Sequence, residues 1–347
     1  MLFYNTFTRK KEPLDKKAGE TVGLYSCGPT VYHFQHIGNF RSFVFADLLR
    51  RALKQGGYKV THVMNITDVG HLAEDTGEDK VEREAKRQKK SAREIADYYT
   101  DDFMRGLKSL NINVAEMAFP RASAHVEEQI ALIKKLEEKG FTYAISDGVY
   151  FDTSKDSGYG TLARLDEAKL LEGARVEKKE EKKNPADFAL WKFSTKSGKR
   201  EQEWPSPWGT GFPGWHIECS AMAMKYLGEH FDIHTGGVDL IFPHHTNEIA
   251  QSESATGGKF VDIWMHSGFV QMGGEKMAKS VGNILRLNEL ERLGFSPLSY
   301  RFLLLGTHYR KPLEWSEEAM TGAQNSFEKL KAHFLALGLP AEASAQA

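Results

Sequence analysis

Two cysteines, one histidine and one glutamate have the residue types and spacing of a metal site. Cys27 and Cys219 are the only cysteines of the chain. His244 and Glu248 lie four residues apart after Pro243, a residue type that often begins a helix, so both side chains should lie on one helix face. Two thiolates, an imidazole and a carboxylate suit zinc, and we predict one zinc ion per chain. The alternative is a core histidine with two inert thiols; we favour zinc because both cysteines lie in glycine-rich or aromatic segments.

The segment from Tyr25 to Asn39 could hold a phosphate group. It follows alternating apolar and polar residues, which predict a strand, and it precedes apolar residues at helical spacing. Gly38 and Asn39 therefore lie at a helix N-terminus, where free N–H groups and the helix dipole suit phosphate. Taken alone, these residues with His36 could equally be a loop without chemistry.

Two lysines form a second candidate for binding phosphate. Lys276 and Lys279 are three residues apart in a segment bordered by glycines. Ammonium groups on such a loop can close over a triphosphate and stabilise the charge as pyrophosphate leaves. A lone pair of lysines is usually a solvated surface, but together with His36 in the other half of a nucleotide-binding sheet it predicts a nucleotide clamp.

The elements that must position these residues alternate between strand and helix. Tyr58 to Ile66 is the next predicted strand, and Thr67 and Asp68 at its carboxyl end should face a cleft. Ser91 with Glu94 forms a capping box that begins a helix. The residues of this helix expected in the core are Ile95, Tyr98, Tyr99, Phe103, Leu107 and Leu110. Ser123 is predicted to begin another helix, followed by a hairpin that turns at residues 146–148.

Composition limits the classes of protein that the chain can represent. It has 347 residues, 41% of them hydrophobic, and a net charge of −1, so contacts with nucleic acid must come from local patches. Charges crowd between residues 74 and 90; a solvated segment is favoured and an RNA-contacting surface is the alternative. No apolar run approaches the roughly 20 residues that span a bilayer, and no signal-peptide pattern begins the chain. We expect a cytoplasmic protein without a membrane segment.

On these motifs the chain resembles the cysteinyl-tRNA synthetases, which are class I aminoacyl-tRNA synthetases. His36-Ile37-Gly38-Asn39 matches the histidine signature of this family, and residues 276–280 match its lysine loop. Residues 214–219 and 244–248 match its zinc segments, with Cys27, Cys219, His244 and Glu248 as the ligands. The resemblance extends through about Trp315 and covers most of the chain.

The resemblance implies an α/β fold. A Rossmann-type parallel-sheet catalytic domain would be split by a connective insertion and followed by a helical stem-contact region. The expected limits are 1–112 for the first half of the catalytic domain, 113–205 for the insertion, 206–257 for the second half, 258–321 for the stem-contact region with the lysine loop, and 322–347 for a remaining helix and tail.

The resemblance also implies a reaction. ATP, as Mg-ATP, would activate L-cysteine to cysteinyl-adenylate, and the cysteinyl group would pass to the 3′ end of tRNA(Cys), bound mainly through its acceptor stem. A zinc–thiolate bond would select cysteine, because zinc prefers a thiolate to the harder hydroxyl of serine. We expect a monomer. The implied catalytic residues are His36, Asn39, Lys276 and Lys279; the ATP-binding residues are His36, Gly38, Asn39, Gly237, Asp239 and Lys279; the cysteine-binding residues are Gly28, Thr67 and Trp215.

Some positions depart from the family pattern. Ala278 replaces a more usual serine in the lysine loop, and Thr235 and Thr246 stand where glycine and glutamate are common. Residues 71–78 appear as an insertion, and after Trp315 we expect one helix, capped by Ser316, with most of the anticodon-binding region absent.

Two other functions stay open. A ligase that passes cysteine to a small-molecule amine, as in the mycothiol pathway, would use the same adenylation residues, and the short C-terminal region favours it. A catalytically inactive paralogue that binds RNA or zinc is disfavoured because His36, Asn39 and both lysines are present.

Overall fold

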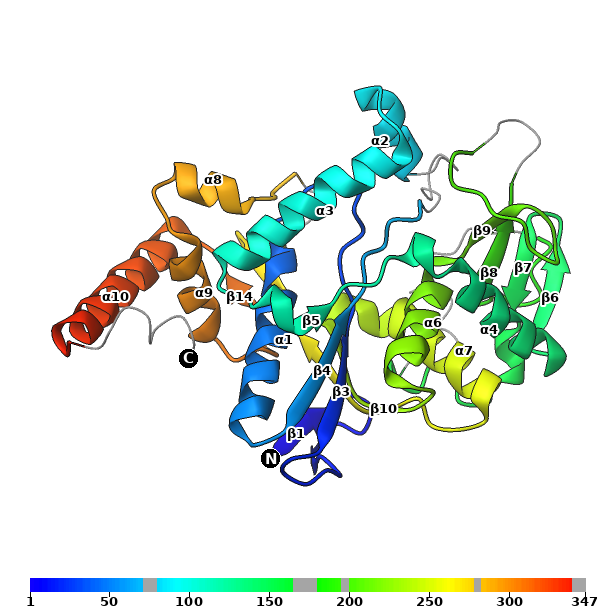
Figure 1. The fold of residues 1–347 in the computed structure, drawn as a ribbon, viewed down its shortest axis with the longest axis horizontal. Coiled ribbons are helices and arrows are strands. Elements are labelled where there is room, and N and C mark those ends of the chain that lie inside the picture. Colours follow the sequence, from blue (N-terminus) through cyan, green and yellow to red (C-terminus); the bar gives the residue numbers. More distant parts are fainter. Residues whose placement is uncertain (71–79, 165–179, 195–199, 278–281, 339–347) are drawn as a thin grey trace.

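A computed structural model describes residues 1–70, 80–164, 180–194, 200–277 and 282–338. At its centre is a parallel sheet of strand order β11-β10-β3-β4-β5 (Figure 1). The strands are β3 (Thr21–Ser26), β4 (Lys59–Met64), β5 (Met117–Ala118), β10 (Phe231–Gly237) and β11 (Val261–Ser267). Helix α1 (Ile37–Gln55) connects β3 to β4, so the predicted βαβ unit is confirmed. Strands β3 and β10, from distant parts of the sequence, are direct neighbours.

A second sheet, antiparallel and four-stranded, is built mainly from the segment between the two halves of the parallel sheet. Its strands are β6 (Thr142–Ile145), β7 (Gly148–Phe151), β8 (Phe188–Phe193) and β9 (Gly211–Pro213). Helices α4 (Val126–Glu138), α6 (Trp215–Leu227) and α7 (Thr246–Thr256) lie between the sheets (Figure 1). Three of the expected domain limits lie shortly before a strand. The limits at 112 and 257 precede β5 and β11, which belong to the parallel sheet, and the limit at 205 precedes β9 of the antiparallel sheet.

Helix α6 connects the two hydrophobic cores. Ile217 and Ala221 pack with α4 and the antiparallel strands, whereas Met222 and Ala223 pack with Tyr25 and other residues of the parallel sheet. Apolar residues therefore surround this helix on more than one face, which is the pattern of a buried helix. Any side chain of α6 that points to the parallel sheet is held at a fixed position.

The remaining elements lie on the other side of α1 and at the chain ends (Figure 1). They are β1 (Leu2–Asn5), β2 (Lys10–Pro13), α2 (Lys80–Gln88), α3 (Ala92–Ser109), β12 (Val270–Met272), β13 (Glu275–Lys276), α8 (Leu287–Arg292), α9 (Pro297–Leu305), β14 (Leu313–Glu314) and α10 (Glu317–Ala336). Among the described residues, no helix is both long enough and apolar enough to cross a bilayer.

The predicted helix starts are partly confirmed. The Ser91 side chain accepts a hydrogen bond from the Glu94 N–H and the Glu94 carboxylate accepts one from the Ser91 N–H, so the capping box is confirmed. Ser123 does not begin a helix, because it lies in a short 3₁₀ turn and its N–H and hydroxyl donate to Asp68 at 2.9 and 2.6 Å; α4 begins at Val126. The prediction that Asp68 faces a cleft is therefore also wrong, since its buried carboxylate is used in this contact.

One residue assigned to the core of α3 is exposed. Tyr98 keeps 43% of its surface accessible, whereas Ile95, Tyr99 and Phe103 are buried. The buried residues recur every four positions along one face, and Tyr98 lies at the edge of this face.

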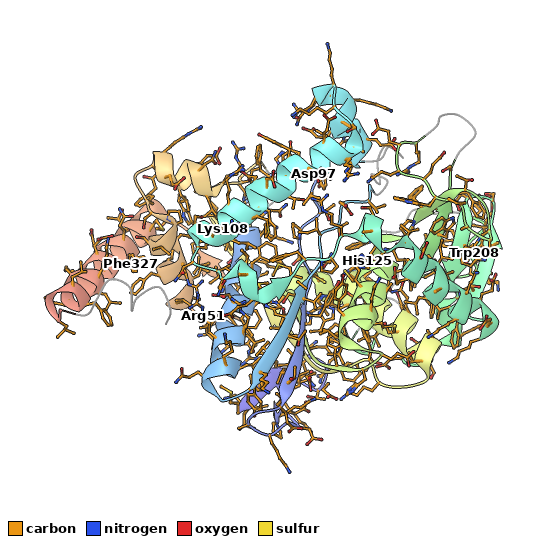
Figure 2. All side chains as sticks on the ribbon, viewed as in Figure 1. Arg51, Asp97, Lys108, His125, Trp208 and Phe327 are labelled. Atoms are coloured by element: carbon orange, nitrogen blue, oxygen red, sulfur yellow. The ribbon has the colours of Figure 1, made fainter. Side chains whose placement is uncertain are left out.

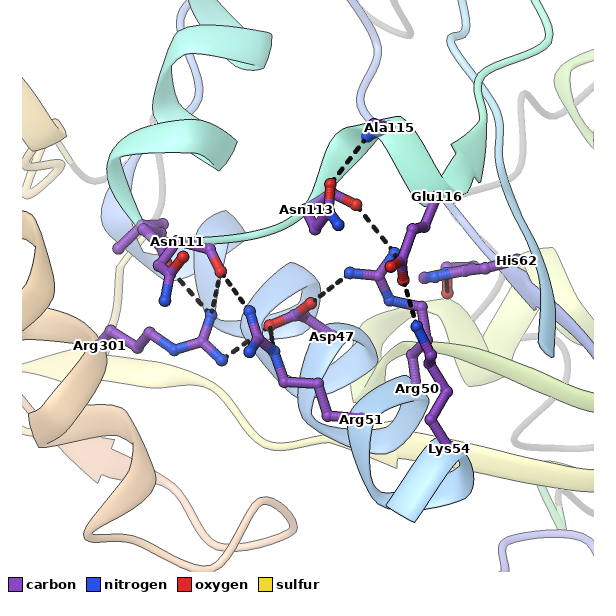
Figure 3. Close-up of polar contacts among 12 residues, drawn as sticks. Asp47, Arg50, Arg51, Lys54, His62, Asn111, Asn113, Ala115, Glu116 and Arg301 are labelled. Atoms are coloured by element: carbon purple, nitrogen blue, oxygen red, sulfur yellow. Dashed lines mark hydrogen bonds and ion pairs between the residues drawn. The ribbon is translucent and has the colours of Figure 1, made fainter. Parts of the chain in front are cut away.

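A buried carboxylate on α1 fixes the C-terminal region against the parallel sheet (Figure 3). Asp47 accepts hydrogen bonds from Arg50 at 2.7 Å, from Arg51 at 2.9 Å and from Arg301 of α9 at 2.7 Å. Arg301 also donates to the backbone carbonyl of Leu110 at the end of α3, at 2.8 Å. Burial alone would raise the pKa of Asp47, but the arginines hold it below its ordinary value. Helices α1, α3 and α9 therefore share one ionic contact.

We predict that Asp47→Asn lowers the free energy of unfolding in urea by about 3–5 kcal/mol, because it leaves buried arginine charges without their partner. The depressed pKa means that the carboxylate stabilises the fold above about pH 4 and stops doing so as the pH falls below that value. The difference between wild type and variant should therefore shrink between about pH 5 and pH 3. Asp102→Asn, which removes an exposed pair with Arg105, is the control and should change stability little. A loss no larger than that of this control would contradict the role assigned to Asp47.

Candidate functional site

Four residues from distant parts of the chain meet between the parallel sheet and the helices that cover it. Cys27 follows β3, Cys219 lies on α6, His244 lies in the turn before α7, and Glu248 lies on α7. One potential ligand atom from each lies within 4.8 Å of all the others, and all four residues are buried. The structure therefore brings together the four predicted zinc ligands. We call them the Cys-Cys-His-Glu cluster.

The local structure around His244 differs from the prediction. Helix α7 begins at Thr246 and not at Pro243, because residues 241–245 form an irregular turn in which Phe242 has an extended conformation. His244 nevertheless reaches Glu248, with 3.0 Å between its Nε2 and the carboxylate.

The charges of the cluster compensate one another. Burial opposes ionisation of Glu248, but His234 and His244 lower its pKa to about 2. Burial would lower the pKa of His244, but Glu248 and Cys219 raise it to about 10. Hydrogen bonding with Cys27 lowers the pKa of the Cys219 thiol, whereas burial and Cys219 raise that of Cys27. The cluster thus combines the ionised Glu248 carboxylate with a protonated His244 imidazole, whose positive charge a divalent cation could replace. Its donor atoms and burial fit zinc.

Four histidines that the sequence interpretation missed lie in or beside the cluster, and one of them, His216, lies 3.0 Å from His244 through the two Nδ1 atoms. His234 of β10 lies 3.0 Å from the second carboxylate oxygen of Glu248. His245 lies 3.3 Å from the Cys27 sulfur through Nε2 and 2.8 Å from His266 through Nδ1. Cys27, Glu248, His234 and His245 form a second group with ligand atoms within 4.8 Å of one another. The signal in the sequence was weak: His234 and His266 lie inside two strands, and His245 directly follows the predicted ligand His244.

Of the residues predicted to bind cysteine, Trp215 and Gly28 lie beside residues of the cluster, and Thr67 is linked to Gly28 through Asn65. The Trp215 ring stacks on His244 with 4.3 Å between ring centroids and keeps 37% of its surface accessible. A Cβ on Gly28 would lie 1.7 Å from the Asn65 carbonyl oxygen, so no larger residue fits there. Asn65, which the sequence interpretation did not single out, accepts a hydrogen bond from the Gly28 N–H at 2.8 Å and donates one to the Thr67 hydroxyl at 3.0 Å. The Asn65 amide therefore holds the positions of Gly28 and Thr67.

The predicted phosphate site lies at the start of α1. His36 is the residue before the helix, and its N–H donates to the Asn39 side chain at 3.1 Å. Asn39 therefore caps the helix in this structure. A Cβ on Gly38 would lie 2.9 Å from the His36 ring, so glycine lets the imidazole lie close to the first turn. This helix end is at the carboxyl edge of the parallel sheet, where such sheets bind ligands.

The first lysine of the lysine loop lies beside the end of β10. Lys276 is 3.2 Å from the Asp239 carboxylate, and its ammonium group lies 4.2 Å from the centroid of the Phe269 ring. A Cβ on Gly237 would approach Asp239 at 2.5 Å and Ser42 of α1 at 3.6 Å. Lys276, Asp239 and Gly237 are therefore close to one another and to α1. Ala278 and Lys279 lie outside the described residues.

Two of the positions that depart from the family pattern, Thr235 and Thr246, have structural roles, whereas residues 71–78 lie outside the described residues. The Thr235 carbonyl accepts a hydrogen bond from the Cys27 N–H at 3.1 Å, and its hydroxyl lies 2.8 Å from the Ser26 hydroxyl. Thr246 donates to the Ile241 carbonyl at 2.8 Å. Neither hydroxyl belongs to the Cys-Cys-His-Glu cluster.

Comparisons with known proteins give a consistent result. Residues 13–325 match the model for the class I (C) tRNA synthetase catalytic domain. The chain is 50% identical over 329 residues to the "Cysteine--tRNA ligase" of Treponema denticola, covering 94% of this chain and 67% of the relative. It is 49% identical over 334 residues to the "Cysteine--tRNA ligase 1" of Burkholderia lata, covering 95% and 71%.

A solved structure supports the fold. The Mycobacterium tuberculosis methionyl-tRNA synthetase in complex with methionyl-adenylate matches with a TM-score of 0.65 and 17% identity, over 87% of this chain and 68% of that one. At this identity the likeness shows the fold alone, a Rossmann-type catalytic domain. The match of residues 13–325 to the family model establishes that the chain belongs to the class I (C) tRNA synthetase catalytic-domain family.

Proposed function

We propose that this protein activates L-cysteine with ATP and transfers the cysteinyl group to the 3′ end of tRNA(Cys). One observation carries the proposal: the buried Cys-Cys-His-Glu cluster and the helix end with the histidine signature are joined by one loop, from Cys27 to His36. A site for a thiol and a site for phosphate are therefore held in one unit. The relatives named "Cysteine--tRNA ligase" support the same reaction.

The Cys-Cys-His-Glu cluster would hold zinc through Cys27, Cys219, His244 and Glu248. The ion would supply a preference for a thiolate over a hydroxyl, which separates cysteine from serine. An apolar pocket alone separates side chains of similar size poorly. The Trp215 ring, stacked on His244, would cover the bound side chain and exclude water.

The phosphate side would work through electrostatics. The N-terminus of α1 offers N–H groups and a positive dipole to the phosphates, with His36 and Asn39 at its first turn. Lys276 and Lys279 would stabilise the charge that develops as pyrophosphate leaves, with magnesium accompanying ATP. Asp239 and Gly237 would bind the adenosine portion.

The ion pair between Lys276 and Asp239 would have to exchange when ATP binds. Both side chains are about half exposed, at 44% and 50% of their surface. Such exposed pairs contribute only about 0–1 kcal/mol, so this exchange costs little. Asp239 would then be free to accept a hydrogen bond from the ribose, and Lys276 to approach a phosphate.

We further propose that the protein acts as a monomer in the cytoplasm and contacts tRNA(Cys) mainly through the acceptor stem, because the acceptor end must reach the site. Both cysteines are free thiols, which suits a reducing compartment.

We predict cysteine-dependent exchange of pyrophosphate into ATP, no detectable exchange with serine, and transfer of cysteine to tRNA(Cys). Radioactive exchange and charging assays measure these steps separately. Comparable exchange with the two amino acids would remove the selection mechanism. Exchange without transfer to any tRNA, but with transfer to an amino sugar, would replace tRNA by a small-molecule acceptor.

We predict about one zinc per chain in protein purified without added metal, and loss of this zinc in Cys219→Ser because a hydroxyl is a poor replacement for a thiolate. Metal analysis after dialysis against a chelator measures both. Met222→Leu, a volume-conserving change at a buried position of the same helix, is the matched control and should retain the metal. Undiminished zinc in Cys219→Ser would remove this residue from the site.

A further inference from the structure

Helix α2 and the turn that joins it to α3 concentrate positive charge in a chain that is otherwise balanced. Residues 81–93 contain six arginines or lysines and two glutamates, whereas the whole chain has a net charge of −1. Of the two glutamates, Glu84 pairs with Arg87 at 2.6 Å and Glu82 lies 3.6 Å from Arg200. Arg93 lies 3.9 Å from Asp97, and the exposed cations that remain are Arg83, Lys86, Lys89 and Lys90.

Aromatic side chains lie directly beside these cations. The exposed Tyr98 ring has the Lys90 ammonium group 4.9 Å from its centroid and Phe34 at 5.8 Å. Phe34 in turn contacts Tyr99 at 4.9 Å, and His33 stacks parallel to Tyr99. The Tyr98 ring therefore rests on a packed aromatic group and presents accessible surface to solvent.

This surface adjoins the proposed active site. His33 and Phe34 belong to the same loop as His36, the residue that caps the N-terminus of α1. Arg83 of α2 acts on the pKa of Tyr32 in this loop, opposing the rise that burial causes. Helices α2 and α3 stand at the end of the molecule towards which this loop rises from the parallel sheet, and α2 projects away from the body (Figures 1 and 2). A ligand that approaches the start of α1 from the side of α2 and α3 therefore passes the cations of α2 and the aromatic side chains beside them.

We propose that Arg83, Lys86, Lys89, Lys90, Phe34 and Tyr98, here called the α2–α3 surface, bind the unpaired 3′ nucleotides of the tRNA as they enter the active site. Cations contact the phosphates of single-stranded RNA, and exposed aromatic rings stack on its bases. The inference rests on the proposed function, because it identifies where the tRNA of that reaction is held. It favours the RNA-contacting alternative for the charged segment over a merely solvated one.

Lys89→Ala/Lys90→Ala tests the cationic part. Binding of fluorescent tRNA(Cys), followed by anisotropy from about 50 to 200 mM salt, should give a log–log salt dependence less steep by roughly 1.4, since each phosphate contact on a single strand contributes about 0.7. The control Lys134→Ala/Lys139→Ala removes the same charge from exposed positions of α4 and its end and should leave the slope unchanged.

Tyr98→Ala tests the stacking part. It should weaken tRNA binding roughly 5- to 100-fold, whereas Tyr98→Phe should bind as the wild type does. A tRNA without its unpaired 3′ nucleotides should bind wild type and Tyr98→Ala equally. Wild-type affinity in Tyr98→Ala, or an equal loss on the shortened tRNA, would overturn the proposal. Cysteine-dependent pyrophosphate exchange should be unchanged in all these variants; its absence from the wild type would instead refute the proposed function.

A separate observation concerns a buried hydroxyl next to the Cys-Cys-His-Glu cluster. Tyr25 is fully buried, and within the described part of the chain its hydroxyl has no hydrogen-bond partner. It lies in β3 opposite His234 of β10, with 5.1 Å between the ring centroids. It also precedes Cys27 by two residues, which is the spacing that places strand side chains on the same face. A buried donor without an acceptor is unfavourable, so an acceptor is expected in the loaded site.

The surroundings of this hydroxyl identify the acceptor. Tyr25 of β3 and Cys219 of α6 belong to the same buried cluster, together with Cys27. Glu248 already contacts His234 and His244, and Cys27 contacts His245. We infer that Tyr25 is a positioning residue that donates its hydroxyl proton in a hydrogen bond to the Cys219 thiolate when the cluster holds zinc.

Tyr25→Phe removes only the oxygen and keeps the ring. Competition with a chelator should show a zinc dissociation constant roughly 10- to 100-fold higher, the usual effect of losing a hydrogen bond to a metal ligand. In cobalt-substituted protein, the thiolate-to-metal absorption band should shift. Tyr150→Phe, which alters a buried hydroxyl bound to Lys192 in the antiparallel sheet, should change neither quantity. Wild-type zinc affinity and an unshifted band in Tyr25→Phe would overturn the inference.

Discussion

The mutual compensation of buried charges in the Cys-Cys-His-Glu cluster is the constraint on which the rest of the site depends. Isolated, a buried carboxylate or imidazolium would be unfavourable, but Glu248 and His244 offset each other's charge at 3.0 Å. The four groups come from the residue after β3, from α6, from the turn before α7 and from α7 itself. The cluster can therefore form only when α6 packs on both hydrophobic cores, so the polar contact and the apolar packing depend on the same helix.

The C-terminal region is tied to this arrangement through α1. At one end of the helix, the Ile37 N–H donates to the Leu285 carbonyl, and the Tyr300 hydroxyl donates to the Ile37 carbonyl. Further along, Asp47 binds Arg301. Helix α1 and the C-terminal region, which border the segment that carries Lys276, are thus fixed to each other. The ammonium group of Lys276 itself is held by an exposed ion pair with Asp239 and by the Phe269 ring. This contrast suits a loop that must change its contacts during the reaction while its supports stay in place.

The sequence was sufficient to predict the βαβ unit and the four residues of the cluster, because these depend on local periodicity and on residue types with few alternative uses. It was insufficient where a side chain's role is decided by a distant partner. Ser123 has the residue type of a helix cap but bonds to Asp68, and Asn65 is an ordinary polar residue until Gly28 is placed beside it. The histidines of β10 and β11 became recognisable only when these strands lay next to the cluster.

The loop from Cys27 to His36 is neither helix nor strand, yet it is rigidly held. The Val31 N–H donates to the Thr67 carbonyl, and the Thr67 N–H donates to the Pro29 carbonyl, so the loop pairs with the segment after β4. Its ends are fixed by β3 and by α1. A cysteine held by its sulfur at one end would therefore have its carboxylate at a set position relative to phosphates held at the other. Selection of the side chain and alignment of the reacting groups thus follow from the same rigid segment, and such alignment accounts for much of the rate of a two-substrate reaction.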